Sequence, residues 1–187
     1  MTRAIDGPCH GSRARGSVPV VEPRVTGVPR VAVKVLLLDP HDRLLLIRSR
    51  DSYTHTECWY PVGGGVEAGE TLQDAAAREA DEETGLRNLP IGRHVWRRDH
   101  TYHYDGRTVQ VHEEWLLHRV AHFQPVPAQL TEHESRSIVS FCWWSLSELA
   151  KSAETVFPPQ LGNLTLDLLT TGLPRTPIDI TSPTTAS

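Results

Sequence analysis

Apolar residues gather in two short runs, 31–38 and 44–48, which are separated by the polar stretch Asp39-Pro40-His41-Asp42. The runs are rich in valine, leucine and isoleucine, whereas the stretch between them holds turn-forming residue types. This pattern predicts two strands joined in a hairpin. A third, shorter strand is expected near 59–62.

Two longer runs follow at about 92–104 and 107–120, on either side of Asp105-Gly106. Because Asp-Gly favours the tight turn that joins antiparallel strands, these runs predict a second hairpin. One more strand is expected over 138–144. Together, the strands predict a sheet in which hairpins are frequent.

A helix is predicted over 71–84. Thr71 followed by Asp74 is typical of an N-terminal capping pair, and Gly85 suits the C-terminal end. Alanines, which have the highest helix propensity, fill much of the interior. The glycines that precede this helix allow a close approach of the backbone to a ligand. These glycines are Gly63, Gly64, Gly65 and Gly69.

Two further helices are expected over 145–150 and 159–169. Several strands flanked by few helices predict an α+β fold, specifically an α/β/α sandwich with a mixed sheet. The length of 187 residues suits one domain with tails. We expect this domain to span 28–170, between flexible tails over 1–27 and 171–187.

The composition is that of a globular protein, with 39% hydrophobic and 22% charged residues. No apolar run approaches the roughly 20 residues needed to cross a bilayer, and nothing resembles a signal peptide. The cysteines, Cys9, Cys58 and Cys142, lie far apart and are odd in number, which argues against a disulfide framework or a cysteine-rich zinc site. These features predict a cytoplasmic protein with no membrane partner.

The net charge of -4 is unevenly distributed. The segment 64–86 holds seven acidic residues and one arginine, a charge of -6, so the rest of the chain carries +2. Within this segment Glu79, Glu82 and Glu83 fall on one face of the predicted helix. Their mutual repulsion favours a bound hard cation such as Mg²⁺ or Mn²⁺, whose preferred ligands are oxygens. The alternative is a solvated helix face braced by Arg78.

The acidic residues follow a fixed spacing. From Gly64 to Leu86 the chain reads G-x5-E-x7-R-E-A-x-E-E-x-G-L. This string resembles the Nudix box, G-x5-E-x7-R-E-U-x-E-E-x-G-U with U apolar, at all nine specified positions. The segment 143–149 also resembles the strand-to-helix segment near the end of Nudix domains.

The resemblance implies an enzyme of the Nudix hydrolase family, which uses divalent metal ions to hydrolyse a pyrophosphate bond in a nucleoside diphosphate linked to another group. It implies that Arg78 holds Glu70 in place, and that Glu82 either binds metal or orients water. The implied metal ligands are the backbone carbonyl of Gly63 and the carboxylates of Glu79, Glu82 and Glu83.

The general base is left open by the resemblance, because the family takes it either from the box or from a loop beyond it. The candidates are Glu82, Glu132 and Glu134. The last two lie in a polar stretch just before the predicted strand over 138–144. The alternative for both is an ordinary surface charge.

Substrate contacts are weakly marked. Arg48 follows the second strand and is a candidate for binding substrate phosphates, although a surface arginine is the simpler interpretation. Tyr104 lies near the position at which diadenosine polyphosphate hydrolases stack a tyrosine on the base. A nucleoside triphosphate or a dinucleoside polyphosphate is the favoured substrate.

Three other functions share this fold. A nucleotide-sensing module without catalysis often lacks box acids, which this chain retains. An isoprenoid diphosphate isomerase requires a catalytic cysteine, for which Cys58 is the candidate. An RNA 5′-end pyrophosphohydrolase is confined to short 5′ ends, because no basic cluster marks the ordered region and long nucleic acids are not expected partners. The choice between monomer and homodimer is open.

Overall fold

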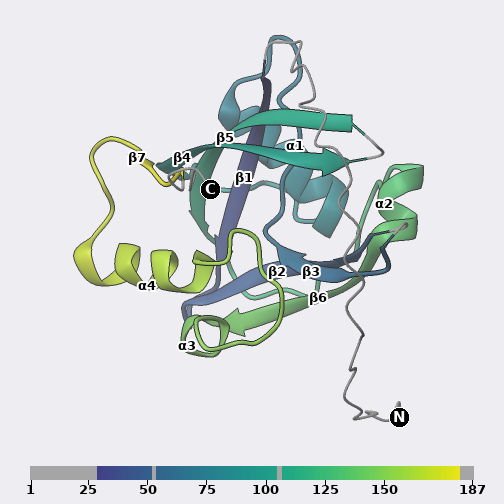
Figure 1. Cartoon of the computed structure of the whole chain (residues 1–187). Coiled ribbons are helices and arrows are strands. Elements are labelled where there is room, and N and C mark those ends of the chain that lie inside the picture. Colours follow the sequence, from purple (N-terminus) through teal and green to yellow (C-terminus); the bar gives the residue numbers. More distant parts are fainter. Residues whose placement is uncertain (1–28, 52–53, 105–106, 182–187) are drawn as a thin grey trace, which may run out of the picture.

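The computed structural model describes residues 29–51, 54–104 and 107–181, in which a mixed sheet is flanked by helices on both faces (Figure 1). This architecture confirms the predicted α+β fold. The elements in chain order are β1 (Arg30–Leu38), β2 (Arg43–Arg50), β3 (Glu57–Tyr60), α1 (Leu72–Thr84), β4 (Arg93–Tyr104), β5 (Arg107–Arg119), α2 (Glu132–Ser137), β6 (Ile138–Ser145), α3 (Leu146–Leu149), α4 (Leu161–Thr171) and β7 (Ile178–Asp179).

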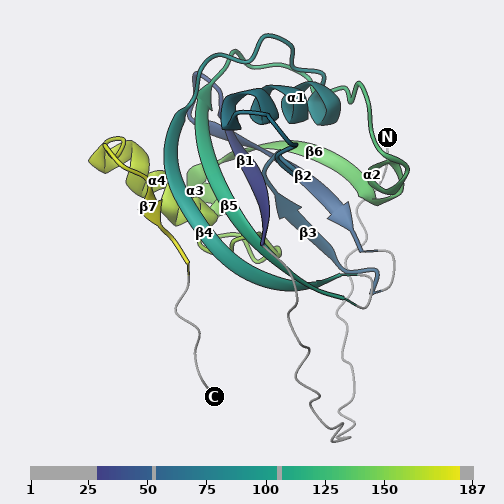
Figure 2. The same cartoon turned by 90° about the horizontal axis from the view of Figure 1, so that it is seen from above.

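The strand order in the sheet is β3-β2-β1-β5-β4-β7, and β6 pairs with β2. Both predicted hairpins, β1–β2 and β4–β5, are antiparallel. The sheet is mixed because β1 runs parallel to β5 and β4 runs parallel to β7. Figure 2 shows the long, curved β4–β5 pair beneath α1. In the described part of the chain, no helix is long and apolar enough to cross a membrane.

The first hairpin opens soon after its turn. β1 and β2 pair next to that turn, and farther along, over 47–50, β2 pairs with β3 instead, whereas β6 pairs with β2 over 43–49. Where β1 no longer pairs with β2, the glycine-rich loop before α1 forms hydrogen bonds with the free edge of β1. Backbone amides of Val33 and Val35 donate to the carbonyls of Gly64 and Val62 at 2.9 and 2.8 Å. The loop before α1 is therefore held by the sheet itself.

Alternate residues of the inner strands pack on opposite faces, as expected for strands that are buried on both sides. One core lies between the sheet and the alanine-rich face of α1. Its members include Val33, Val35, Leu45, Ile47, Ala75, Ala76 and Ala80.

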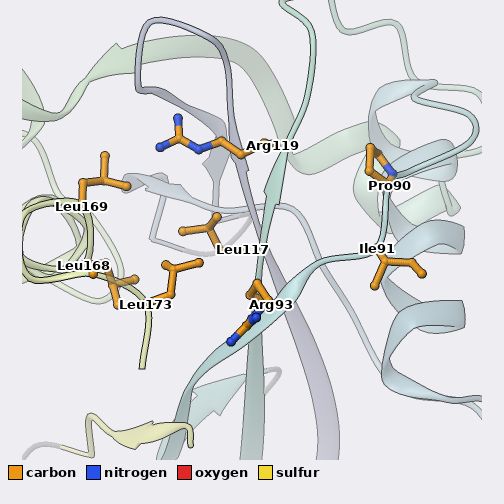
Figure 3. Close-up of a pocket in the computed structure, with 9 residues that line it drawn as sticks. Pro90, Ile91, Arg93, Leu117, Arg119, Leu168, Leu169 and Leu173 are labelled. Carbon is orange, nitrogen blue, oxygen red and sulfur yellow. The ribbon is translucent and has the colours of Figure 1, made fainter. Parts of the chain in front are cut away.

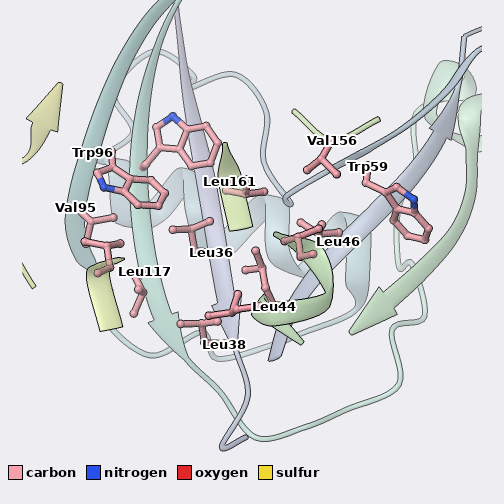
Figure 4. Close-up of a cluster of buried hydrophobic side chains, with 14 residues drawn as sticks. Leu36, Leu38, Leu44, Leu46, Trp59, Val95, Trp96, Leu117, Val156 and Leu161 are labelled. Carbon is pink, nitrogen blue, oxygen red and sulfur yellow. The ribbon is translucent and has the colours of Figure 1, made fainter. Parts of the chain in front are cut away.

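The second core lies on the other face, beneath α3 and α4 (Figure 4). Trp96 and Trp115 pack edge to face in it, with ring centroids 5.7 Å apart. These tryptophans are therefore core residues. Other members are Leu36, Leu38, Leu44, Leu46, Trp59, Leu117 and Leu161.

Three details differ from the sequence-based expectation. The polar stretch before β6 forms the short helix α2, which Thr131 caps through a reciprocal capping box with Glu134. The third strand begins earlier than predicted, at Glu57. Within the expected C-terminal tail, β7 pairs with β4, so the tail prediction is wrong for this portion. The N-terminal tail over 1–27 lies outside the described residues.

Candidate active site

The box occupies the loop before α1 and α1 itself. Thr71 and Asp74 form a reciprocal capping box at the start of the helix, and Gly85 ends it in the left-handed conformation with a φ of 72°. The alanine face is buried, and the same orientation carries Glu79 and Glu83 inward, where they are 6% and 3% exposed. The sequence therefore buries two carboxylates, although burying an ionised carboxylate costs free energy.

Arg78 is the centre of an ion-pair network. Its guanidinium donates to Glu70 at 2.8 and 3.1 Å and to Glu79 at 2.8 Å. It also donates to Glu82 at 3.1 Å and to the carbonyl of Gly65 at 2.8 Å. These contacts lower the pKa of Glu70 to about 2, mainly through the hydrogen bond from Arg78. One side chain thus joins the loop to three acids of the box.

Glu83 has fewer partners. Its carboxylate accepts a hydrogen bond from the backbone amide of Gly63 at 2.8 Å. Burial raises its pKa to about 8, and the charges of Glu79 and Glu134 add to this effect, whereas the Gly63 amide and the charge of Lys34 oppose it. A carboxylate that is costly to ionise when alone is well suited to bind a cation.

Glu79 is a second buried carboxylate. Burial raises its pKa, and the contact with Arg78 offsets part of that rise. Among the described residues, no group of three or more His, Cys, Asp or Glu side chains already surrounds a common metal position. Arg78 and the Gly63 amide hold the box carboxylates instead. The oxygen-rich donor set nevertheless fits Mg²⁺ or Mn²⁺, provided that these contacts rearrange.

Two loop glycines are sterically required for different reasons. A Cβ on Gly63, whose φ is 138°, would overlap the backbone carbonyl of Val33, whereas a Cβ on Gly64 would overlap the Glu79 carboxylate. We expect Gly63→Ala to lower the melting temperature strongly, because a backbone atom cannot give way. Gly64→Ala should cost about 1 kcal/mol or less while weakening Mg²⁺ binding at least roughly tenfold.

Thermal melts and Mg²⁺ titrations of both variants test this difference. Equal losses of stability in the two variants, with Mg²⁺ affinity unchanged in Gly64→Ala, would contradict it.

The candidates for a general base separate in space. Glu134 is partly buried at the start of α2, where it accepts hydrogen bonds from Thr131, and its charge raises the pKa of both Glu79 and Glu83. Glu132 instead pairs with Arg136 on the exposed side of the same helix. The structure therefore brings Glu134, and not Glu132, near the buried carboxylates.

A family model described as the NUDIX domain matches residues 28–164. The chain belongs to the Nudix family. This match confirms the family that the box predicts.

Solved Nudix structures share the fold. A MutT Nudix hydrolase from Burkholderia pseudomallei has a TM-score of 0.58 at 20% identity, covering 75% of this chain and 99% of that one. The Nudix domain of NrtR from Shewanella oneidensis, in complex with ADP ribose, has a TM-score of 0.56 at 17% identity, covering 80% and 94%.

A curated relative is more similar over a shorter segment. The m7GpppN-mRNA hydrolase NUDT17 of Danio rerio is 46% identical over 61 residues, which is 32% of this chain. The matched segment spans only 20% of the relative's length.

The predicted substrate-binding residues lie away from the box or outside the described side chains. Arg48 packs over Trp59, 5.6 Å from the ring centroid, and pairs with Glu57 at 2.6 Å. Its neighbour Ile47 packs against the α1 core, so Arg48 lies on the other face of the sheet. Tyr104 ends β4, and its side chain lies outside the described part of the structure. Contacts of either residue with substrate stay predictions.

Cys58, the cysteine considered for isomerase chemistry in this Nudix fold, lies on β3. It is half-buried, and burial raises the pKa of its thiol. Its environment therefore favours the neutral thiol over the thiolate.

Two cavities lie outside the box. One, of about 350 Å³, lies between α4 and the beginning of β4 and is lined by Arg93, Leu117 and Leu168 among others (Figure 3). The second, of about 620 Å³, is lined in part by Arg98, His100 and Val111 on β4 and β5. Only the second lies beside the buried carboxylate of Glu113, which both Arg98 and His100 contact.

Sequence reasoning missed one charged residue of the candidate active site, Lys34. It lies in the middle of β1, within an otherwise apolar run, and its ammonium lies 5.7 Å from the ring centroid of Tyr60. A charge inside a strand that is buried on both faces is the signal that could have revealed it.

Proposed function

We propose that this Nudix protein hydrolyses a pyrophosphate bond in a nucleoside triphosphate or a dinucleoside polyphosphate, with Mg²⁺ or Mn²⁺ as cofactor. The observation that carries the proposal is the buried pair Glu79 and Glu83 on one helix face, beside a glycine loop that the sheet holds in place. Arg78 already contacts Glu79, but ionised Glu83 is destabilising unless a further cation joins the pair, and the natural co-ligand of a divalent cation is a phosphate.

Each box residue has a distinct role in the proposed reaction. Glu79, Glu82, Glu83 and the Gly63 carbonyl would hold the metal. A divalent ion bound there supplies charge neutralisation at the phosphate oxygens and acidifies water. Arg78 acts as a positioning residue, because it fixes the loop and Glu70 relative to α1.

The proposed general base is Glu82 or Glu134. Glu82 is the most exposed of the three box glutamates on α1, with a side chain 33% accessible, and can therefore reach a solvent-derived nucleophile. Glu134 lies on α2 beside the buried pair. Either carboxylate would accept the proton of the attacking water as it approaches phosphorus in line with the leaving group.

The cavity beside Arg98 and His100, of about 620 Å³, has the size typical of small-ligand sites, so substrates with a bulky group beyond their phosphates belong in the test. The names of similar proteins suggest which groups to test. These groups are ADP ribose and an m7GpppN cap, in addition to nucleoside triphosphates and dinucleoside polyphosphates.

The test is a hydrolysis screen of these compounds with the full chain, in Mg²⁺, Mn²⁺ or EDTA. We expect metal-dependent turnover of one class, with a nucleoside monophosphate among the products. Nucleotide binding without turnover in either metal would contradict the enzyme proposal and favour the sensing function. Reaction in ¹⁸O-labelled water would identify the phosphorus that is attacked.

A further inference from the structure

Lys34 is chemically unusual in this chain. It and Lys151 are the only lysines, against 17 arginines, and Lys34 is half-buried in β1. Its neighbours Val33 and Val35 pack toward α1, whereas Leu36 and Leu38 belong to the opposite core. By strand alternation Lys34 therefore projects from the face opposite α1.

The backbone of Lys34 lies directly against the box loop. The hydrogen bonds from Val33 to Gly64 and from Val35 to Val62 flank it, which places Lys34 opposite Gly63. A Cβ on Gly63 would lie only 3.0 Å from the Cα of Lys34. The amide of Gly63 donates to Glu83, which is a proposed metal ligand. The backbone of Lys34 therefore lies next to the residue that holds this ligand.

The ammonium of Lys34 has an aromatic neighbour but no carboxylate at contact distance. It lies 5.7 Å from the centroid of the Tyr60 ring, and no ion pair within 4.0 Å joins it to a described acid. Its charge nevertheless lowers the pKa of both Glu83 and Glu113. The ammonium thus acts on both buried carboxylates through its charge, and no ion pair within 4.0 Å joins it to either of them.

Both of these carboxylates are already engaged. Glu113 accepts from His100 at 3.0 Å, from the Trp115 indole at 3.2 Å and from Arg98 at 3.5 Å. Glu83 accepts from the Gly63 amide. A half-buried ammonium that forms no ion pair with these engaged carboxylates keeps its donors available for an anion.

We propose that Lys34 binds a non-bridging oxygen of the substrate's diphosphate, with its stem resting on the Tyr60 ring. The assignment rests on the proposed pyrophosphohydrolase function and makes Lys34 a substrate-binding residue outside the box. Lysine suits this position, since an ammonium is a compact point charge that can bind phosphate from a narrow space.

The two-lysine composition permits a direct test. Reductive methylation with ¹³C-formaldehyde labels Lys34, Lys151 and the α-amino group while preserving their charge. The signals are assigned with Lys34→Arg and Lys151→Arg. On titration with methylenediphosphonate in Mg²⁺, the Lys34 signal should shift with saturation, whereas the exposed Lys151 should not. A saturable complex that leaves the Lys34 signal unmoved would overturn the inference.

Kinetics supply a second readout. Lys34→Met keeps the aliphatic stem and removes the charge, so KM and the Kd for methylenediphosphonate should rise about 10- to 100-fold. Lys34→Arg should recover at least half of that effect on a logarithmic scale, and Lys151→Met should behave as wild type. If Lys34 acts only by tuning Glu83, Lys34→Met will instead change the pH profile of kcat and leave the Kd unaltered, which refutes the inference.

The two proposals fail in different ways. A wild-type chain that neither hydrolyses the screened compounds nor binds methylenediphosphonate contradicts the proposed function, and the Lys34 assignment with it. A wild-type chain that does both, beside a Lys34→Met variant with unchanged KM and Kd, contradicts the Lys34 assignment alone.

Discussion

Arg78→Gln is expected to lower the free energy of unfolding by about 2–4 kcal/mol and to reduce turnover by at least roughly 100-fold. The guanidinium holds three carboxylates and the carbonyl of Gly65, and the Arg78 side chain is only 24% exposed. Its removal leaves Glu79 buried without its cation. The loop also loses one of its attachments to α1, the hydrogen bond to the Gly65 carbonyl, so the metal ligands lose part of their positioning.

Added Mg²⁺ distinguishes the two parts of this effect. A cation can replace the lost positive charge among the carboxylates, so saturating Mg²⁺ should stabilise Arg78→Gln more than it stabilises the wild type. Turnover should stay low, because the hydrogen bond to Gly65 is not restored. Chemical denaturation with and without Mg²⁺ measures the first quantity, and initial rates measure the second.

Arg87→Gln is the matched control, because it removes an arginine that is 78% exposed and lies 3.6 Å from Asp81 just beyond the same helix. We expect a change of less than about 0.5 kcal/mol and no loss of turnover. If Arg78→Gln behaves like this control, the ion-pair network does not organise the box.

The sequence predicts the box well because its chemistry and its local structure depend on the same residues. Thr71, Asp74 and Gly85 set the ends of α1, and its alanines determine which face of the helix is buried. Once that face is fixed, helical periodicity alone places Glu79 and Glu83 inward. The hairpins were predictable for a similar reason, since turn residues separate clear apolar runs.

The remaining features depend on long-range contacts. The position of Lys34 beside Gly63 arises because β1 leaves β2 and pairs with the glycine loop, which no local pattern records. β7 consists of two exposed residues that pair with β4, and such a short segment has no hydrophobic period to detect. The helix α2 carries a capping box at Thr131 and Glu134, a local signal that could have predicted it.

Glu83→Gln should reduce turnover by roughly 1,000-fold or more while stabilising the metal-free protein at high pH. The folded-state pKa of Glu83, about 8, lies above the ordinary value of 4.5. The stability associated with its proton is therefore complete below about pH 4.5 and is lost as the pH rises through 8. Glutamine stays neutral and can still accept from the Gly63 amide.

In EDTA at pH 9, Glu83→Gln should thus melt at least about 2–4 °C above the wild type, and this difference should shrink toward pH 5. With saturating Mg²⁺ the order should reverse, because the wild type gains a charged ligand that the variant lacks. Glu67→Gln removes an exposed charge from the same loop and should show neither trend. If the difference in melting temperature between Glu83→Gln and the wild type does not change with pH, Glu83 ionises in the folded protein at no cost. Relief of a buried charge would then not explain metal binding at this site.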